Sequence, residues 1–316
     1  MADSKKNSDP QESVPELAPA PLAYLNPDFL NSPDGRILRI LSEYAEPLAR
    51  FRREKIQDTV VFFGSARFAS LPDAQNALTI LEKPGSAKPA PPQEQPGGKD
   101  GDQLQAALKR AHAAVQMARY YEDARRLSFM LTEWSLTLPG KRHRFVVTSG
   151  GGPGIMEAAN RGAREAGGKT IGLNIRLPFE QYPNQFITPE LNFEFHYFFM
   201  RKYWFAYPAK ALVVFPGGFG TLDEMFEILT LAQTHKLAKK ILVIVYGTEY
   251  WKTVLNFDAL VDAGTIAPED VNAFTMVDSP DEAFEVLKDG LTRFHLQPQQ
   301  ARPAQEEGPE IAKTLP

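Results

Sequence analysis

Residues 211–224 read Ala211-Leu-Val-Val-Phe-Pro-Gly-Gly-Phe-Gly-Thr-Leu-Asp-Glu224, and this stretch decides the fold class. Its first five residues are apolar without polar alternation, which is typical of a strand buried on both faces. Pro216 ends the strand, and the glycines after it allow the backbone to approach a ligand closely. We expect a helix to begin at Thr221, with its first amides and its dipole directed at the glycine turn. A strand, a glycine turn and a helix N-terminus in this order predict a site for an anion such as phosphate.

A structural role competes with the functional one for the end of this stretch. Thr221-Leu-Asp-Glu224 matches a capping box, in which the threonine hydroxyl accepts from the Glu224 amide and the glutamate reaches back. The same glutamate stands one turn into the expected helix, where it could act chemically beside a bound phosphate. The two roles are compatible, because a capping carboxylate would be held still.

The composition excludes several classes of function. The chain has 316 residues, 43% of them hydrophobic and 23% charged, which suits an ordinary globular protein of one large or two small domains. It contains no cysteine, so disulfides, thiolate metal sites and cysteine nucleophiles are excluded, and we expect a cytoplasmic protein. No apolar run reaches the roughly 18 residues that cross a bilayer, and no signal-peptide pattern is present, so we expect neither membrane insertion nor secretion. The net charge of −4 favours a small ligand in a local positive site over nucleic acid or anionic lipid.

Three stretches are rich in proline and small polar residues, and we expect them to be flexible. They are an N-terminal tail at 1–35, an insertion at 83–99 and a C-terminal tail at 297–316. The remainder, 36–296, is expected to form a single domain.

Within that domain, apolar runs alternate with helical periodicities. The expected strands are 59–63, 144–148, 170–175, 211–215 and 241–246, with an alternating stretch at 193–199. The expected helices are 36–54, 73–82, 103–137, 155–166, 201–207, 222–235, 249–263 and 280–294. This alternation predicts an α/β fold with a doubly wound, mostly parallel sheet covered by helices on both faces. Ligands in such sheets bind at the carboxyl ends of the strands.

Three glycine-bearing turns fall at such strand ends, at 63–67, 148–156 and 215–221, and together they would line one crevice. The second turn lacks the G-x-G-x-x-G spacing, and the strand after it places no acid for a ribose diol, which disfavours a dinucleotide site. No Walker lysine precedes Thr221, which disfavours a nucleoside triphosphatase of that class. The five histidines show no metal-ligand spacing, so we expect no metal and no cofactor.

Three segments resemble the LONELY GUY (LOG) family, the cytokinin-activating phosphoribohydrolases long labelled lysine decarboxylases. They are Pro216 to Glu224, Met200-Arg201-Lys202 upstream of it, and Ser149-Gly-Gly-Gly-Pro-Gly-Ile-Met156. They occur in the family's order within 59–246, and the separation of Arg201 from Glu224 also fits. The resemblance implies a Rossmann-like nucleotide-binding fold and a homodimer or higher homo-oligomer. It implies hydrolysis of a nucleoside 5′-monophosphate to free base and ribose 5-phosphate. Longer relatives include general nucleotide nucleosidases, so base preference stays open.

The resemblance also assigns residues. Arg201 and Glu224 match the family's catalytic pair. The implied substrate-binding residues are Lys202, Gly217, Gly218, Phe219, Gly220, Thr221, Leu222, Asp223 and Thr230, with Gly151, Gly152, Gly154 and Met156 from the second glycine turn. Ser65, Asn174 and Glu180 lie near expected strand ends and are further candidates, each with an alternative role as a turn, core or surface residue.

The chemistry of the reaction accounts for the catalytic pair. Breaking a C1′–N bond builds positive charge on the sugar, and a carboxylate can stabilise that charge or deprotonate the attacking water. We expect Glu224 to be this carboxylate. Arg201 is no acid at neutral pH, because the guanidinium pKa exceeds about 12, so it would hold the phosphate or orient Glu224. The donor of a proton to the leaving base is not identified.

One alternative remains open. A non-catalytic binder of nucleotides or of the molybdenum cofactor would share this fold and these glycine loops. A lysine decarboxylase would require a pyridoxal-phosphate lysine motif, which the chain lacks.

Overall fold

Seven strands pair side by side in a single sheet, and every pair is parallel. The computed structural model describes residues 19–83, 100–178, 182–234, 236–237 and 239–297. Most of the insertion and most of the two terminal tails expected from the sequence lie outside these residues. The chain divides into two compact units, Met1–Ser42 and Glu43–Pro316, and the sheet belongs to the second.

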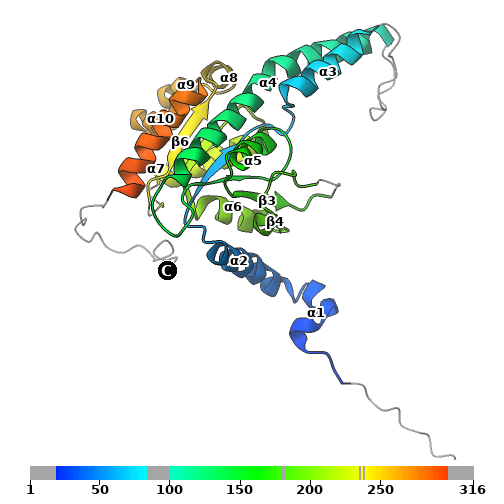
Figure 1. Cartoon of the computed structure of the whole chain (residues 1–316), viewed down its shortest axis with the longest axis vertical. Helices are drawn as coiled ribbons and strands as arrows, with labels where there is room; N and C mark the ends of the chain where they lie inside the picture. The colour runs from blue at the N-terminus through cyan, green and yellow to red at the C-terminus, as the bar shows by residue number, and fades with distance from the viewer. Residues whose placement is uncertain (1–18, 84–99, 179–181, 235, 238, 298–316) are drawn as a thin grey trace, which may run out of the picture. The chain divides into compact units, whose positions relative to one another are not determined.

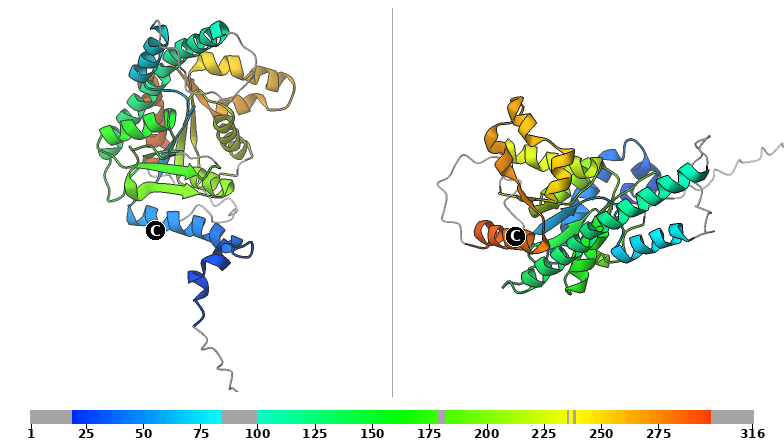
Figure 2. Two further views of the ribbon diagram at one scale, coloured as in Figure 1. Left: turned by 90° about the vertical axis from the view of Figure 1, so that its right-hand side faces the viewer. Right: turned by 90° about the horizontal axis from the view of Figure 1, so that it is seen from above.

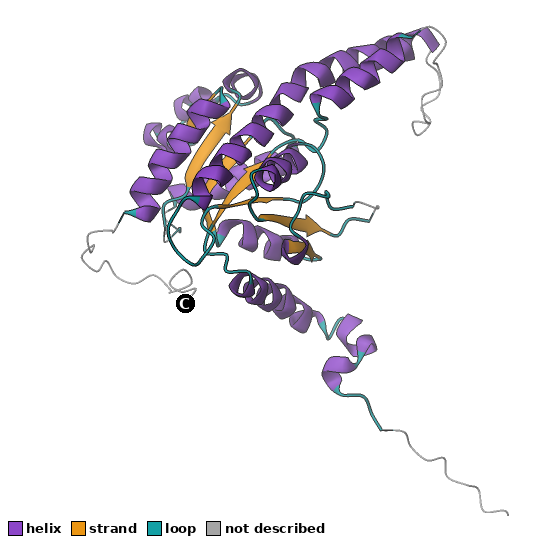
Figure 3. Ribbon diagram, in the orientation of Figure 1, coloured by secondary structure: helices purple, strands orange, loops and turns teal. Residues whose placement is uncertain are grey.

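The elements follow one another in an alternating order (Figures 1 and 3). The strands are β1 (Thr59–Phe63), β2 (Val146–Ser149), β3 (Thr170–Ile175), β4 (Asn192–Phe195), β5 (Ala209–Val214), β6 (Leu242–Tyr246) and β7 (Thr275–Val277). The α-helices are α1 (Pro27–Asn31), α2 (Arg36–Arg53), α3 (Leu71–Glu82), α4 (Asp100–Leu136), α5 (Ile155–Glu165), α6 (Phe198–Ala206), α7 (Phe219–Gln233), α8 (Thr248–Val254), α9 (Phe257–Asp262) and α10 (Pro280–Leu291). Short helical turns are η1 (Ala23–Leu25), η2 (Pro189–Leu191), η3 (Pro268–Ala273) and η4 (Thr292–Leu296).

The order of the strands places a topological switch at the centre of the sheet. That order is β4-β3-β2-β1-β5-β6-β7, so the chain winds outward from β1 to β4 and then returns to lay β5 beside β1. The connections after β1 and β5 therefore leave in opposite directions. In open α/β sheets this arrangement opens a crevice outside the carboxyl ends of the two central strands. The prediction of a Rossmann-like, doubly wound parallel α/β fold is confirmed.

Helices cover both faces of the sheet (Figure 2). Val60 and Phe62 of β1 are fully buried in a core shared with α4, α5 and α10. On the other face, the ring of Phe63 meets that of Phe205 in α6, with centroids 4.9 Å apart. All five residues of β1 are buried, which is why its sequence lacks polar alternation.

Helices α4 and α5 approach each other very closely on the first of these faces. Ser128 of α4 donates a hydrogen bond of 2.7 Å to the carbonyl of Ala159 in α5. A Cβ atom at Gly162 would lie 2.0 Å from the carbonyl oxygen of Arg125. Only a glycine therefore fits at this crossing.

Several expected boundaries are wrong, and the differences concern short or aromatic segments. The stretch at 193–199 forms a strand only to Phe195, and α6 begins at Phe198 instead of Arg201. The span 249–263 is broken into α8 and α9, and β7 was not expected at all.

The described part of the first unit, residues 19–42, contains η1, α1 and the start of α2. Helix α1 lies within the segment expected to be a tail, and the Asn26 side chain caps it by accepting from the amides of Asp28 and Phe29. Across the described residues, no helix is both long and apolar enough to span a membrane.

Candidate active site

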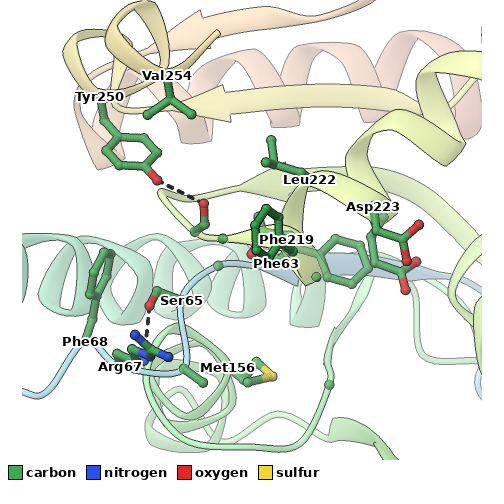
Figure 4. Close-up of a pocket in the computed structure, with 18 of the residues that line it drawn as sticks. Phe63, Ser65, Arg67, Phe68, Met156, Phe219, Leu222, Asp223, Tyr250 and Val254 are labelled. Carbon is green, nitrogen blue, oxygen red and sulfur yellow. Dashed lines mark hydrogen bonds between the residues drawn. The ribbon is translucent and has the colours of Figure 1, made fainter. Parts of the chain in front are cut away.

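A cavity of about 770 Å³ lies at the carboxyl ends of the two central strands. Its lining comes from the segments that follow β1, β2 and β5, from α6 and α4, and from α8 (Figure 4). Of the residues expected at the site, those on the lining are Ser65, Met156, Arg201, Gly217, Gly218, Phe219, Gly220, Thr221, Leu222, Asp223 and Glu224. All three glycine turns thus border one crevice, as their positions at strand ends predict.

The helix at this cavity begins earlier than expected. Helix α7 starts at Phe219, Gly218 is its N-cap residue, and no side chain caps it. Thr221 is consequently the third residue of the helix, and the expected capping box with Glu224 is wrong. The first amides of α7 are left without a side-chain partner and border the cavity, where the helix dipole favours an anion.

The glycine turn before α7 is fixed by packing against its own helix and by a tyrosine. A Cβ atom at Gly217 would lie 2.1 Å from the hydroxyl oxygen of Thr221, so a side chain there would push the turn away from the helix. The hydroxyl of Tyr250 in α8 donates a 2.9 Å hydrogen bond to the Gly217 carbonyl (Figure 4). Tyr250 also borders the cavity, so it links the turn to the wall opposite.

Glu224 lies at the edge of the cavity beside a lysine shared by three carboxylates. The ammonium of Lys202 lies 3.3 Å from Glu224, 2.8 Å from Asp223 and 2.8 Å from Glu227. Burial opposes the charge of Lys202, but hydrogen bonds to Asp223 and Glu227 outweigh it and raise the pKa of the ammonium. Lys202 itself is not part of the cavity lining, whereas two of its partners, Asp223 and Glu224, are.

The residue Glu224 is only 8% exposed. Burial raises its pKa, and the nearby charges of Lys202 and Arg201 offset part of that effect. A buried carboxylate with a raised pKa is a stronger base than one in water, and the two cations favour its ionised form.

Arg201 reaches the cavity from the first turns of α6. Its Nε donates to the carbonyl of Leu173 at 2.7 Å, and an Nη donates to that of Gly150 at 3.4 Å. Burial lowers the pKa of its guanidinium to about 10, which Glu224 partly offsets, so the group stays charged at neutral pH. A Cβ at Gly150 would lie 2.6 Å from this guanidinium and 2.7 Å from the sulfur of Met156. Because Gly150 has no side chain, the Arg201 guanidinium has room to lie against this turn.

The first glycine turn is joined to the other two by backbone hydrogen bonds. The amide of Ser65 donates to the carbonyl of Pro216 at 3.0 Å, and the amide of Ile155 donates to the carbonyl of Ser65 at 3.0 Å. Gly154 has φ of 71°, and a Cβ there would lie 2.3 Å from that same Ser65 carbonyl. The three turns thus form one connected rim.

The second glycine turn is supported from behind by asparagines. The Asn184 side chain donates to the carbonyls of Gly151 and Gly152, both at 3.1 Å, and to the side-chain oxygen of Asn160 at 2.9 Å. Asn174 is 8% exposed and lies directly under Gly151, where a Cβ would come within 2.2 Å of its Oδ1. Gly151, Gly152, Gly154 and Asn174 therefore shape the turn from positions outside the cavity lining.

A further expected residue is not brought to the cavity. Thr230 faces a separate cavity of about 90 Å³ between α7 and α9, and Glu180 lies outside the described residues.

Sequence reasoning missed part of the lining. These residues are Arg67, Phe68, Met117, Tyr250 and Val254. Arg67 stands in the first glycine turn, which the sequence did single out, and its position after a strand end was the available signal. Met117, Tyr250 and Val254 lie on helices far along the chain, and nothing in their local sequence distinguishes them from ordinary core or surface residues.

Comparison with known proteins supports a family relationship. Residues 156–287 match the family described as "Possible lysine decarboxylase". The chain is 27% identical over 181 residues to the cytokinin riboside 5′-monophosphate phosphoribohydrolase LOG5 of Arabidopsis thaliana, covering 51% of this chain and 75% of that protein. It is 30% identical over 153 residues to the cytokinin riboside 5′-monophosphate phosphoribohydrolase LOG1 of the same plant. This match covers 47% of this chain and 69% of LOG1. Among solved structures, a molybdenum cofactor carrier protein of Chlamydomonas reinhardtii is 18% identical with a TM-score of 0.38, covering 74% of this chain and 99% of that one.

Proposed function

Because the chain belongs to the LOG family, we propose that it hydrolyses the N-glycosidic bond of a nucleoside 5′-monophosphate, with a cytokinin riboside 5′-monophosphate as one candidate substrate. The products are the free base and ribose 5-phosphate. The observation that carries the proposal is the meeting, in one cavity, of an uncapped helix N-terminus with a buried carboxylate one turn into the same helix.

The N-terminus of α7 would bind the 5′-phosphate. Its first amides carry partial positive charge and have no side-chain cap, and the adjoining Gly218 has open space where a Cβ would stand. Arg201 adds a full positive charge on the same lining. A phosphate bound here would place its ribose toward the interior of the cavity, near Glu224.

Glu224 would act as the catalytic carboxylate at the glycosidic carbon, C1′. In the reaction, a water oxygen bonds to C1′ as the C1′–N bond breaks, and the base leaves with the bonding electrons and takes up a proton, so that the two protons of the water end on the sugar hydroxyl and, by exchange, on the base. Glu224 stabilises the positive charge that develops on the sugar and accepts the proton of the attacking water. Its raised pKa strengthens it as a base, while Lys202 at 3.3 Å favours the ionised form that both roles need.

The apolar part of the cavity lining suits the base. Phe68, Met117, Phe198 and Val254 supply apolar surface there, contributed by four separate segments. Aromatic and thioether side chains pack well against a flat heterocycle. An apolar substituent on the base would add to this contact, which supports inclusion of cytokinin ribotides among the substrates to be tested.

Decarboxylation of lysine fits the cavity poorly. Among the described residues that border it there is no lysine, so the cavity offers no amine for a Schiff base with pyridoxal phosphate. The family description that mentions this activity therefore receives no support from the side chains present.

The test is turnover by the purified chain and by a matched pair of variants. We expect free base to be released from AMP, other nucleoside monophosphates or a cytokinin ribotide, but not from the corresponding nucleosides. Glu224→Gln should lower kcat by about 100-fold or more, because it removes a base whose contribution is typically of that order. Glu227→Gln is the control, since Glu227 shares Lys202 but does not border the cavity.

Two results would contradict the proposal. One is the absence of free base with every substrate in the panel, with tight binding of a phosphorylated ligand then pointing to a carrier. The other is equal activity of Glu224→Gln and the wild type.

We further propose a homo-oligomer located in the cytoplasm. The oligomer is supported by exposed aromatic side chains on α6 and α7, where Phe198 is 55%, Phe199 51% and Phe219 93% exposed. The location is supported by the absence of cysteine from the chain. Size-exclusion chromatography with light scattering tests the oligomer, and a monomer at micromolar concentration would contradict it.

A further inference from the structure

A second cavity, of about 260 Å³, lies at the amino-terminal edge of the sheet, away from the glycine turns. Its titratable lining residues are Asp58, Arg144, Lys210 and His295. Asp58 directly precedes β1, Arg144 lies two residues before β2, and Lys210 is the second residue of β5. The amino ends of three adjacent strands thus bring two strong cations and a histidine around a single carboxylate.

Both oxygens of the Asp58 carboxylate already accept hydrogen bonds from within the protein. Asp58 is 1% exposed; one of its oxygens accepts from the Phe145 amide at 2.6 Å, and the other accepts from Arg144 Nε at 2.8 Å. Burial raises the pKa of Asp58, and Arg144 offsets part of that effect. Because Asp58 already pairs with Arg144, little of its negative charge remains to neutralise Lys210.

Two other groups on the cavity, the Lys210 ammonium and the Nε2 of His295, have no such pairing with the residues that the structure describes. Within the described part of the chain, no group accepts a hydrogen bond from the Lys210 ammonium or lies at ion-pair distance from it. The Nε2 atom of His295 is buried, again without a hydrogen-bond partner among described residues. Buried polar atoms are normally paired, so the unpaired Nε2 of His295, on a polar cavity shared with the half-buried Lys210 ammonium, indicates a missing partner that is anionic.

The pKa shifts of the groups around this cavity also favour an anionic ligand. Burial lowers the pKa of Lys210, and that of the adjacent Lys239, whose ammonium donates to the Tyr207 carbonyl, falls to about 7. Burial and the charges of Lys210, Lys239 and Arg144 also lower the pKa of His295 to about 4, although the backbone of Lys240 acts in the opposite direction. Burial is the main cause of each of these shifts, and neighbouring positive charges add to it, so a bound anion would oppose their contribution.

We propose that this cavity binds a doubly charged tetrahedral oxyanion, either sulfate or the phosphate group of a small metabolite, through Arg144, Lys210 and His295. Arg144 and Lys210 supply positively charged donors, and the unpaired Nε2 of His295 becomes a further donor when the charge of the bound anion favours protonation of the ring. The site is separate from the cavity at the carboxyl ends of the strands, since the two linings share no residue. It therefore stands whether or not the chain hydrolyses nucleotides.

Isothermal titration calorimetry with sulfate near pH 6.5 tests the proposal. Sulfate keeps both charges at this pH, so its own titration does not enter. The wild type and Lys109→Met, a control at an exposed lysine on α4, should bind sulfate alike. Lys210→Met should weaken binding by at least 10-fold, and Lys210→Arg should restore it, which separates the loss of charge from any damage to the fold.

A second variant distinguishes the two cavities. Gly217→Val places a side chain against Thr221 and disturbs the turn before α7, so it should remove any sulfate bound there while leaving the amino-edge site intact. The proposal is overturned if Lys210→Met binds sulfate as the wild type does, or if Gly217→Val alone abolishes binding. Repeating the titration with ribose 5-phosphate then shows whether the site accepts a phosphate ester or an adventitious ion only.

Discussion

Replacing Gly150 by alanine is expected to damage catalysis while leaving the fold intact. The new Cβ would lie 2.6 Å from the Arg201 guanidinium and 2.7 Å from the Met156 sulfur, whereas ordinary contact begins at 3.4 Å. Both neighbours are the far ends of flexible side chains, so they can retreat without moving the backbone. The guanidinium must shift by about 0.8 Å.

The size of the effect follows from this shift. Arg201 keeps its 2.7 Å bond to the Leu173 carbonyl as a pivot and loses the 3.4 Å contact with Gly150. A misplacement near 1 Å at a catalytic site costs up to about 100-fold in rate. We expect kcat/KM to fall by about 10- to 100-fold, equivalent to about 1.4–2.7 kcal/mol of transition-state stabilisation. The free energy of unfolding should change by less than about 1 kcal/mol, because no backbone atom is displaced.

A double-mutant cycle isolates the cause. Base release from AMP is measured for Gly150→Ala, for Arg201→Ala and for the two combined, with urea unfolding of each. If Gly150→Ala acts by moving Arg201, it should cost less than about two-fold once the arginine is gone. Fully additive losses would refute the reasoning, and so would a drop in unfolding free energy large enough to explain the lost activity.

Three further predictions concern the turn before α7, the carboxyl in the cavity and the α4–α5 crossing. Tyr250→Phe removes the donor to the Gly217 carbonyl, so KM for a nucleoside monophosphate should rise several-fold with little change in kcat, and an unchanged KM would count against the contact. Because burial raises the pKa of Glu224, and its ionised form is the active one, the acidic limb of the kcat/KM profile should lie above the ordinary value of 4.5; a limb at or below that value would contradict this role. Gly162→Ala would force a Cβ to 2.0 Å from the Arg125 carbonyl, and should lower the free energy of unfolding in urea by about 2–4 kcal/mol through overpacking and a disturbed hydrogen bond. An unchanged urea midpoint would show that α4 and α5 can separate at no cost.

The sequence predicted the sheet well because its strands are buried on both faces. The apolar run that makes up all but the first residue of Thr59–Phe63 leaves few other options, and the structure forms this strand with the expected bounds. β7 has only three residues and no apolar run, so no pattern marks it. The order of the strands depends on packing between distant segments, and a parallel pattern alone does not determine it.

The start of α7 shows where local patterns mislead. Thr221 and Glu224 have the residue types and spacing of a capping box, yet the helix begins at Phe219 and Glu224 lies against Lys202. An ion pair formed with α6 replaces the local cap, and a pattern of four residues carries no information about it. The position of Tyr250 was hidden for the same reason, because its contact with Gly217 spans 33 residues.

The central strand β1 joins two features that its own residues do not form. Asp58 precedes its first residue and Gly64 follows its last, so five residues set the distance between the two edges of the sheet. Side chains alternate along a strand, and the insertion or deletion of one residue would turn Val60 and Phe62 toward the opposite face. The same change would move either Asp58, at the amino end of β1, or the glycine turn at its carboxyl end out of position. The length of β1 should therefore be under tighter constraint than the identity of its apolar residues, several of which could be exchanged for others of similar volume.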